Sequence, residues 1–306
     1  MAVAVKTEGL TKTFKRFMYK EPVSAVSDLN LEVHEGEIFG FLGPNGAGKT
    51  TTIKMLLGLT FPTAGKAWLL EKPAGDIQVK TLISYLPESP YFYEHMSGTE
   101  LLSFYARLFH MDERRLKVEQ LLRMVGLYAD RHKPLSQYSK GMLQRIGIAQ
   151  ALVNDPKLLF FDEPTSGLDP IAHAEIRDLI LRLRDEGRTV FLSSHQLSDV
   201  EMVCDRVAIL NRGKLLRLGR LDEMLAGGCM EIKAENVEPK AVDKIKAAGA
   251  GVRMEDGRVV ITQDEGKGVD QVIDAIRAGQ GHILSVIPQR RSLEDLFVET
   301  IREGCE

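Results

Sequence analysis

Through residues 1–220, short apolar runs alternate with amphipathic stretches. The stretches 99–109 and 171–187 carry helical spacing, and the second ends at Gly187, as a helix often does. Short apolar runs that alternate with helices predict an α/β core built on a parallel sheet of buried strands. The runs are EIFGFL (37–42), LISYL (82–86), KLLFF (157–161), TVFLSS (189–194) and RVAIL (206–210).

The segment of about 88–155 breaks this alternation. It is rich in helical patterns and contains no convincing strand, although it lies between two runs predicted as core strands. We therefore expect a helical subdomain inserted into the α/β core.

The pattern changes after Leu221, where the predicted elements follow the order β-α-β-β-α-β. That order is the split βαβ, or ferredoxin-like, arrangement. A last helix opens at Ser292 with Asp295 three residues on, which is the spacing of a capping box. The sequence thus predicts two domains, 1–220 and 221–306. The elements of the second are a strand at 229–234, a helix at 238–249, strands at 251–255 and 258–262, a helix at 268–279 and a strand at 282–287.

Composition is that of an ordinary globular protein, with 44% hydrophobic and 27% charged residues among 306 and a net charge of −3. This charge gives no sign of a nucleic-acid surface. The three cysteines, Cys204, Cys229 and Cys305, are scattered without metal-ligand spacing, which favours a reduced, cytosolic setting. The N-terminus is too polar for a secretory signal, and no stretch approaches the roughly 18 apolar residues of a membrane span. Work at a membrane must therefore go through a partner chain.

The segment GPNGAGKT (43–50) follows an apolar run and opens a predicted helix, which is the context of a phosphate-binding P-loop. Its glycines let the backbone turn N–H groups toward phosphate oxygens. We expect Lys49 to reach the β- and γ-phosphates of ATP and the Thr50 hydroxyl to bind Mg²⁺. The predicted nucleotide-binding residues of this loop are Gly43, Pro44, Asn45, Gly46, Ala47, Gly48, Lys49, Thr50 and Thr51.

A second motif, LLFFDEP, ends an apolar run in two carboxylates. Asp162 stands at the predicted strand end, where an aspartate that faces the P-loop holds Mg²⁺. Glu163 follows it, placed to orient and deprotonate a water molecule. The sequence therefore predicts Asp162 as a metal residue and Glu163 as the catalytic base.

A second candidate anion site is YSKGMLQR (138–145), because a hydroxyl, a lysine and a glycine stand at the start of a predicted helix. With the P-loop and the carboxylate pair, it makes residues 1–220 resemble the ATP-binding subunits of ABC transporters, whose signature motif is commonly LSGGQ. In that family two nucleotide-binding domains pair head to tail, and each signature helix caps the γ-phosphate held by the other domain. The resemblance implies that Ser139 and Gly141 contact the partner's ATP. Lys140 stands where many members have glycine.

Other positions also resemble the family. SGLD (166–169) is similar to the D-loop that crosses the dimer interface, with Asp169 as its carboxylate. His195 is similar to the switch histidine that contacts the γ-phosphate. Glu88 stands where the family often has a glutamine that touches Mg²⁺ or the attacking water, so the resemblance implies a catalytic and metal role for it.

Aromatic residues leave alternatives open at two places. The resemblance implies an aromatic side chain that stacks on adenine, and Phe14 is the candidate, with Phe17 and Tyr19 as alternatives. The segment PYFYEHM (90–96) borders the groove that receives a short permease helix in the family. Its three aromatic residues are either binding anchors for that helix or part of the packing of the helical subdomain.

The resemblance implies an ATPase, with ATP and Mg²⁺ as cofactors, that powers a separate permease from the cytoplasmic face of the membrane. It implies as partners that permease and a second copy of the chain or a paralogous subunit, and no nucleic acid. The tail QRRSLEDLFVETI resembles that of ABC-2 type exporter ATPases, which favours export over import. A non-transport ABC ATPase acting on nucleic acid or ribosomes is the main alternative. The sequence has neither the long coiled coils nor the second nucleotide domain that such proteins use, and its Asp–Glu pair argues against a subunit without turnover.

Overall fold

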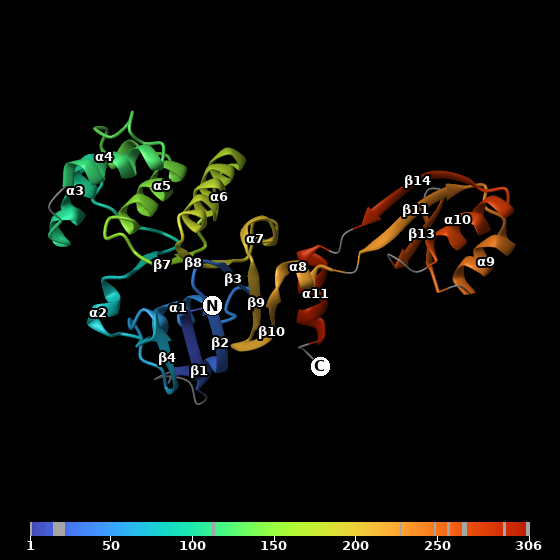
Figure 1. Cartoon of the computed structure of the whole chain (residues 1–306), viewed down its shortest axis with the longest axis horizontal. Coiled ribbons are helices and arrows are strands. Elements are labelled where there is room, and N and C mark those ends of the chain that lie inside the picture. The colour runs from blue at the N-terminus through green and yellow to red at the C-terminus, as the bar shows by residue number, and fades with distance from the viewer. Residues whose placement is uncertain are drawn as a thin grey trace. The chain divides into compact units, whose positions relative to one another are not determined.

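The protein divides into two units in this computed structural model (Figure 1). The first comprises Met1–Leu221 together with Thr300–Glu306, and the second comprises Asp222–Glu299. The sequence pattern predicts a C-terminal domain over all of residues 221–306, whereas Leu221 and Thr300–Glu306 belong to the first unit. The structure describes residues 2–14, 22–111, 114–226, 228–247, 249–255, 258–264, 268–289 and 292–303.

Within the described residues of the first unit, a six-stranded sheet has the order β10-β9-β3-β8-β7-β6. All neighbours are parallel except β10, which returns beside β9 as an antiparallel edge. Every residue of β3, β7 and β8 is buried, as expected for parallel strands covered on both faces. Each predicted apolar run forms one of these strands, so the predicted α/β core with a parallel sheet is confirmed. The strands are β3 (Ile38–Leu42), β6 (Ile83–Leu86), β7 (Leu158–Asp162), β8 (Thr189–Ser194), β9 (Arg206–Asn211) and β10 (Lys214–Arg220).

A second, antiparallel sheet of the first unit has the order β2-β1-β4-β5 and was not predicted. Along β2, Leu29, Leu31 and Val33 are buried while the residues between them face outward. Such alternation is typical of a sheet with one solvated face. The core strands were predicted from continuous apolar runs. Half-exposed strands have no such runs, because polar residues alternate with the buried ones. The strands are β1 (Val3–Phe14), β2 (Val23–His34), β4 (Ala64–Leu69) and β5 (Lys72–Pro73).

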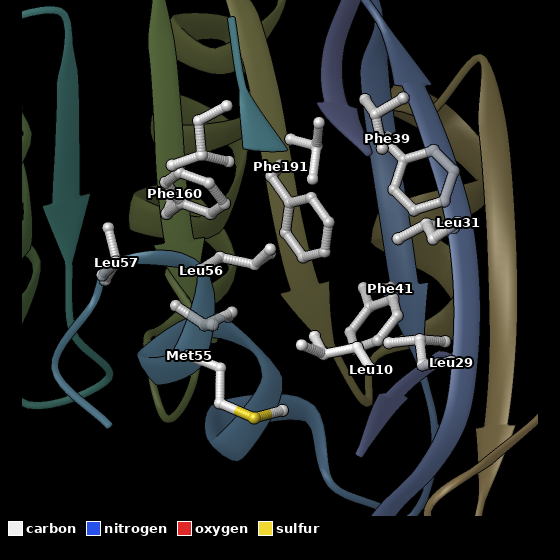
Figure 2. Close-up of a cluster of buried hydrophobic side chains, with 14 of the residues drawn as sticks. Leu10, Leu29, Leu31, Phe39, Phe41, Met55, Leu56, Leu57, Phe160 and Phe191 are labelled. Atoms are coloured by element: carbon white, nitrogen blue, oxygen red, sulfur yellow. The ribbon is translucent and has the colours of Figure 1, made fainter. Parts of the chain in front are cut away.

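Aromatic rings form the centre of the core that joins the two sheets (Figure 2). The ring centroid of Phe191 on β8 lies 5.1 to 5.5 Å from those of Phe39, Phe41 and Phe160, and all four side chains are fully buried. Burial of each ring contributes about 1.5–3 kcal/mol, so this cluster holds β3, β7 and β8 firmly in register. The same cluster includes residues of the antiparallel sheet and of helix α1 (Lys49–Leu56), among them Leu10, Leu29, Leu31, Met55 and Leu56.

Helices α3, α4 and α5 lie between β6 and β7 in the chain, in the segment where the sequence predicts a helical subdomain. Figure 1 shows them grouped apart from β1, β2 and β4. Helix α3 begins with a capping box, in which Ser97 and Glu100 satisfy each other's backbone N–H groups. None of the helices in the described ranges is both long enough and apolar enough to span a bilayer. Besides α1, the helices that begin in the first unit are α2 (Ile77–Lys80), α3 (Gly98–Leu108), α4 (Arg114–Met124), η1 (Leu135–Gln137), α5 (Lys140–Ala151), α6 (Pro170–Asp185), α7 (Leu197–Val203) and α8 (Leu221–Met224), of which only Leu221 belongs to that unit.

The second unit has the predicted order β-α-β-β-α-β, and its antiparallel sheet has the order β12-β13-β11-β14. Its own core packs α9 and α10 on this sheet through residues such as Ile232, Ile245, Ile261 and Ile276. Helix α11 follows, and Ser292 accepts a hydrogen bond from the Asp295 N–H at 3.1 Å, as the capping-box spacing predicts. The elements that begin in the second unit are β11 (Cys229–Glu235), α9 (Pro239–Ala247), β12 (Gly251–Glu255), β13 (Arg258–Asp264), α10 (Val269–Ala278), β14 (His282–Gln289) and α11 (Leu293–Glu303), whose residues from Thr300 onward belong to the first unit.

Candidate nucleotide-binding site

The loop of residues 43–48 joins β3 to α1 in a conformation that requires glycine. Gly46 and Gly48 have φ of +80° and +105°, in the region that L-residues avoid. A Cβ at Gly48 would overlap the carbonyl oxygen of Ala25, and one at Gly43 would lie 2.6 Å from the carbonyl oxygen of Leu210. Helix α1 begins at Gly48 without a side-chain cap. Its first N–H groups are therefore free to bind an anion.

A cavity of about 560 Å³ opens over this loop. Its other walls come from β2 and from the segments that follow β6, β7 and β8, at the carboxyl ends of the parallel strands. Ligands of open α/β sheets bind at this edge. Every predicted P-loop residue except Gly43 lines the cavity. The lining residues are Ala25, Pro44, Asn45, Gly46, Ala47, Gly48, Lys49, Thr50, Thr51, Glu88, Glu163, Ser166 and His195.

Three charged or titratable groups meet on the floor of this cavity. The Nζ of Lys49 donates a hydrogen bond to the Gly43 carbonyl at 2.7 Å and lies 3.3 Å from Oε1 of Glu163. The other oxygen of Glu163 accepts the backbone N–H of His195 at 3.1 Å and lies 2.6 Å from Nδ1 of its ring. Lys49 and Glu163 are both buried, and each compensates the charge of the other. Glu163 also has φ of +52°, a strained conformation that directs its carboxylate back toward the P-loop.

Asp162, the last residue of β7, is buried and is held by two hydroxyl groups. Ser193 of β8 donates to its Oδ1 at 2.5 Å, and Tyr85 of β6 donates to its Oδ2 at 3.4 Å. Burial, together with the neighbouring negative charge of Asp162, raises the pKa of Tyr85 to about 12, so its hydroxyl remains a donor at neutral pH. Neither Tyr85 nor Ser193 belongs to a motif that predicts a role in the site. The signal that identifies them is the strand register, which pairs Ser193 with Asp162.

The residues predicted to meet a partner's nucleotide lie elsewhere in the chain. Ser139 caps α5, with its Oγ accepting the Met142 N–H at 3.2 Å. Gly141 packs so closely on α6 that a Cβ there would lie 2.8 Å from Cβ of Ala172. Asp169 caps α6 by accepting the N–H groups of Ile171 and Ala172. Ser139, Gly141 and Asp169 do not line the cavity over the P-loop.

The comparisons with known proteins agree with this geometry. Residues 26–166 match the family described as ABC transporter. An uncharacterized ABC transporter ATP-binding protein of Synechocystis sp. is 40% identical over 99% of this chain and 86% of its own length. The chain belongs to the ABC transporter ATP-binding proteins. It is an ATPase subunit, as the sequence predicted.

Two further relatives of this ABC ATPase extend the likeness. The fluoroquinolones export ATP-binding protein of Mycobacterium tuberculosis is 36% identical over 96% of the chain and 92% of its own length. Among solved structures, the dimeric post-hydrolysis state of an ATP-binding cassette bound to ADP and Pi matches with a TM-score of 0.64 and 26% identity. That match covers 71% of this chain and 98% of the cassette. ATP-binding subunits of this family act with membrane permeases.

Glu88 and Phe14 have different positions relative to the site of the ABC ATPase. Glu88 is exposed and lines the cavity with Glu163 and His195. Phe14, at the end of β1, is 45% exposed, contacts the ammonium of Lys12 and does not line the cavity. The two alternatives for an adenine-stacking residue, Phe17 and Tyr19, lie outside the described residues.

The aromatic residues of segment 90–96 differ in burial. Phe92 is buried, and a Cβ at Gly147 of α5 would lie 3.4 Å from its ring, so it packs the helical subdomain. Tyr91 and Tyr93 are 96% and 55% exposed. Their side chains are available to a partner.

The oxygen donors of the site suit Mg²⁺ bound together with a nucleotide. Thr50, which lines the cavity, offers a hydroxyl. Asp162 precedes the lining residue Glu163 and is buried without lining the cavity itself, and it offers a carboxylate whose two oxygens each keep a further lone pair. No cluster of three or more His, Cys, Asp and Glu side chains that could hold a metal occurs in the described part of the chain. Mg²⁺ needs none, because it binds through one or two carboxylates with phosphate oxygens and water.

Proposed function

We propose that this ABC ATPase hydrolyses Mg²⁺–ATP as a dimer with two composite sites. Each site combines the P-loop cavity of one subunit with Ser139 and Gly141 of the other. The observation that supports this is their separation within one chain. The cavity contains the P-loop, Glu163 and His195, whereas the signature residues lie outside its lining. The second subunit is another copy of this chain or a paralogue.

Glu163 is the proposed base in this site. Lys49 and His195 both hold its carboxylate when no phosphate competes for them. A γ-phosphate attracts the Lys49 ammonium and the His195 ring, because its oxygens carry more negative charge than one carboxylate. Glu163 is then free to accept a proton from the attacking water. Thr50 and Asp162 hold Mg²⁺, which neutralises charge on the phosphate oxygens, and Glu88 faces the same space.

A mixture of two inactive variants tests the composite site. Lys49→Ala removes the cation of the P-loop face, and Ser139→Arg obstructs the signature face without touching the cavity. Neither variant hydrolyses ATP alone. Mixed at equal concentration, they recover about one quarter of the wild-type rate, because half of the dimers are mixed and each mixed dimer has one intact site. If Ser139→Arg hydrolyses ATP normally, the proposal is wrong.

We propose that the subunit works in export. The relative from Mycobacterium tuberculosis that is aligned over nearly the whole chain is named for fluoroquinolone export. Inverted membrane vesicles, in which this chain is exposed to the medium together with its permease, test the direction. Export predicts that external Mg²⁺–ATP drives a fluoroquinolone or another cargo into the vesicles. Movement of the cargo out of the vesicles instead refutes export.

Tyr91 and Tyr93 are the proposed contact with the permease, which places the subunit at the cytoplasmic face of the membrane. Exposed tyrosines supply large contact area at low entropic cost. Replacing both by alanine is expected to abolish copurification with the permease while the thermal melting of the isolated subunit stays unchanged. Phe92→Ala is the contrasting variant, because removal of its buried ring destabilises the subunit by about 3–5 kcal/mol.

A further inference from the structure

Three neighbouring parallel strands end beside the carboxylate of Asp162. The register pairs Asp162 of β7 with Ser193 of β8, and Tyr85 of β6 with Phe160, two residues before Asp162. The two hydroxyl groups therefore approach the carboxylate from opposite neighbours in the sheet. Ser193 donates to Oδ1 at 2.5 Å, and Tyr85 donates to Oδ2 at 3.4 Å.

Both donors are neutral, which matters for a buried carboxylate. Asp162 is 2% exposed and Ser193 is 0% exposed, so the hydrogen bonds replace water that the carboxylate has lost. A lysine or arginine in either place would cancel the negative charge and compete with a cation. Two hydroxyl groups fix the orientation of the carboxylate and leave its charge and its remaining lone pairs for a ligand.

Ser193 also contacts the backbone of Glu163, the residue that carries the second carboxylate of the site. Its carbonyl oxygen accepts the backbone N–H of Glu163 at 3.0 Å, at the residue whose φ is +52°. One residue of β8 thus orients Asp162 through its side chain and supports the turn at Glu163 through its backbone. The side chain can be removed by mutation while the backbone contact stays.

We propose that Tyr85 and Ser193 are positioning residues that hold the Asp162 carboxylate in the orientation that binds Mg²⁺ of the Mg²⁺–ATP complex. This inference rests on the metal role assigned to Asp162 in the proposed function. Neither hydroxyl touches the nucleotide. They act on ATP binding only through the metal, and their removal leaves metal-free binding to the P-loop intact.

The test measures ATP affinity by calorimetry twice for each protein, once with Mg²⁺ and once with EDTA. Wild type is compared with Ser193→Ala, Tyr85→Phe and the double variant. Ser194→Ala is the matched control, because Ser194 is the next residue of β8, is equally buried, and uses its hydroxyl to accept the Gln196 N–H at 3.0 Å instead. Ser193→Thr keeps the hydroxyl and is the rescue variant.

Ser193→Ala is expected to reduce the gain in ATP affinity that Mg²⁺ provides by about 10-fold or more, as loss of groups that orient metal ligands does. Tyr85→Phe reduces it less, by about threefold, because its hydrogen bond is longer. Affinity in EDTA stays at the wild-type value for all variants, and Ser194→Ala and Ser193→Thr keep the gain from Mg²⁺.

Two results would overturn the inference. One is a gain from Mg²⁺ that is the same in wild type and in both hydroxyl-deleted variants. The other is a loss of ATP affinity that is equal with Mg²⁺ and with EDTA. Such a loss would show that the two hydroxyl groups stabilise the strand ends and do not act through the metal. If Ser193→Ala does not fold, Tyr85→Phe decides, since it removes one oxygen atom from a partly exposed side chain. If wild type itself gains nothing from Mg²⁺, the metal role of Asp162 in the proposed function has failed instead.

Discussion

Alanine substitutions at two glycines of the P-loop distinguish the cost of backbone strain from the cost of steric overlap. Gly46 and Gly48 both have positive φ, but a Cβ at Gly46 meets no atom within 4 Å, whereas one at Gly48 overlaps the Ala25 carbonyl oxygen. An L-residue in a left-handed conformation costs about 1–2 kcal/mol, and this applies to both positions. Overpacking adds about 1–3 kcal/mol, and this applies to Gly48 alone. We expect Gly46→Ala to lose about 1–2 kcal/mol of unfolding free energy and Gly48→Ala about 2–5 kcal/mol.

Urea unfolding followed by tryptophan fluorescence measures this difference. Trp68 is the sole tryptophan of the chain and lies on β4, so its emission reports on the first unit. The midpoint should fall further for Gly48→Ala than for Gly46→Ala, with the same dependence on urea concentration in both. Equal losses of stability in the two variants would show that β2 does not approach the P-loop as closely as described.

Other expected outcomes concern the site, the domain division and a buried thiol. Glu163→Gln should bind ATP but not hydrolyse it, and should elute as a dimer in size-exclusion chromatography with Mg²⁺–ATP; wild-type turnover contradicts the role of Glu163 as base. Lys49→Ala should abolish ATP binding measured by calorimetry, and retained affinity contradicts its role. A chain that ends after Leu221 should keep nucleotide affinity, and loss of affinity in a truncated chain shown to be folded by circular dichroism contradicts the domain division. Burial raises the pKa of the Cys204 thiol well above its ordinary value, so an alkylating reagent should label Cys204 only after unfolding, as read by mass spectrometry of the peptide.

The core strands were predictable because parallel strands covered on both faces leave an uninterrupted apolar run in the sequence. The antiparallel sheet leaves no such run. Its buried residues, such as Leu29 and Leu31, are separated by polar residues on the solvated face. A search for the alternating pattern with a period of two would have found β2.

The sequence located part of the candidate site where its residues are adjacent in the chain: the P-loop and Glu163 were expected to lie together, and both line the cavity. Tyr85 and Ser193 were not predicted, because their contacts with Asp162 join neighbouring strands of a sheet whose register the sequence does not specify. Lys140 shows the converse. It stands where many members of the family have glycine, and the structure gives it an ordinary right-handed conformation as the first residue of α5.

The ion pair between Lys49 and Glu163 bears on what an unassembled subunit does in a cell. Within a single chain Glu163, the proposed base, is engaged by Lys49 and His195, and neither Ser139 nor Gly141 lines the cavity. In the proposed composite site, hydrolysis depends on the meeting of two subunits and, in dilute solution, rises with the square of their concentration. Copies that stay dilute and unpaired would therefore leave the ATP pool of the cell almost untouched.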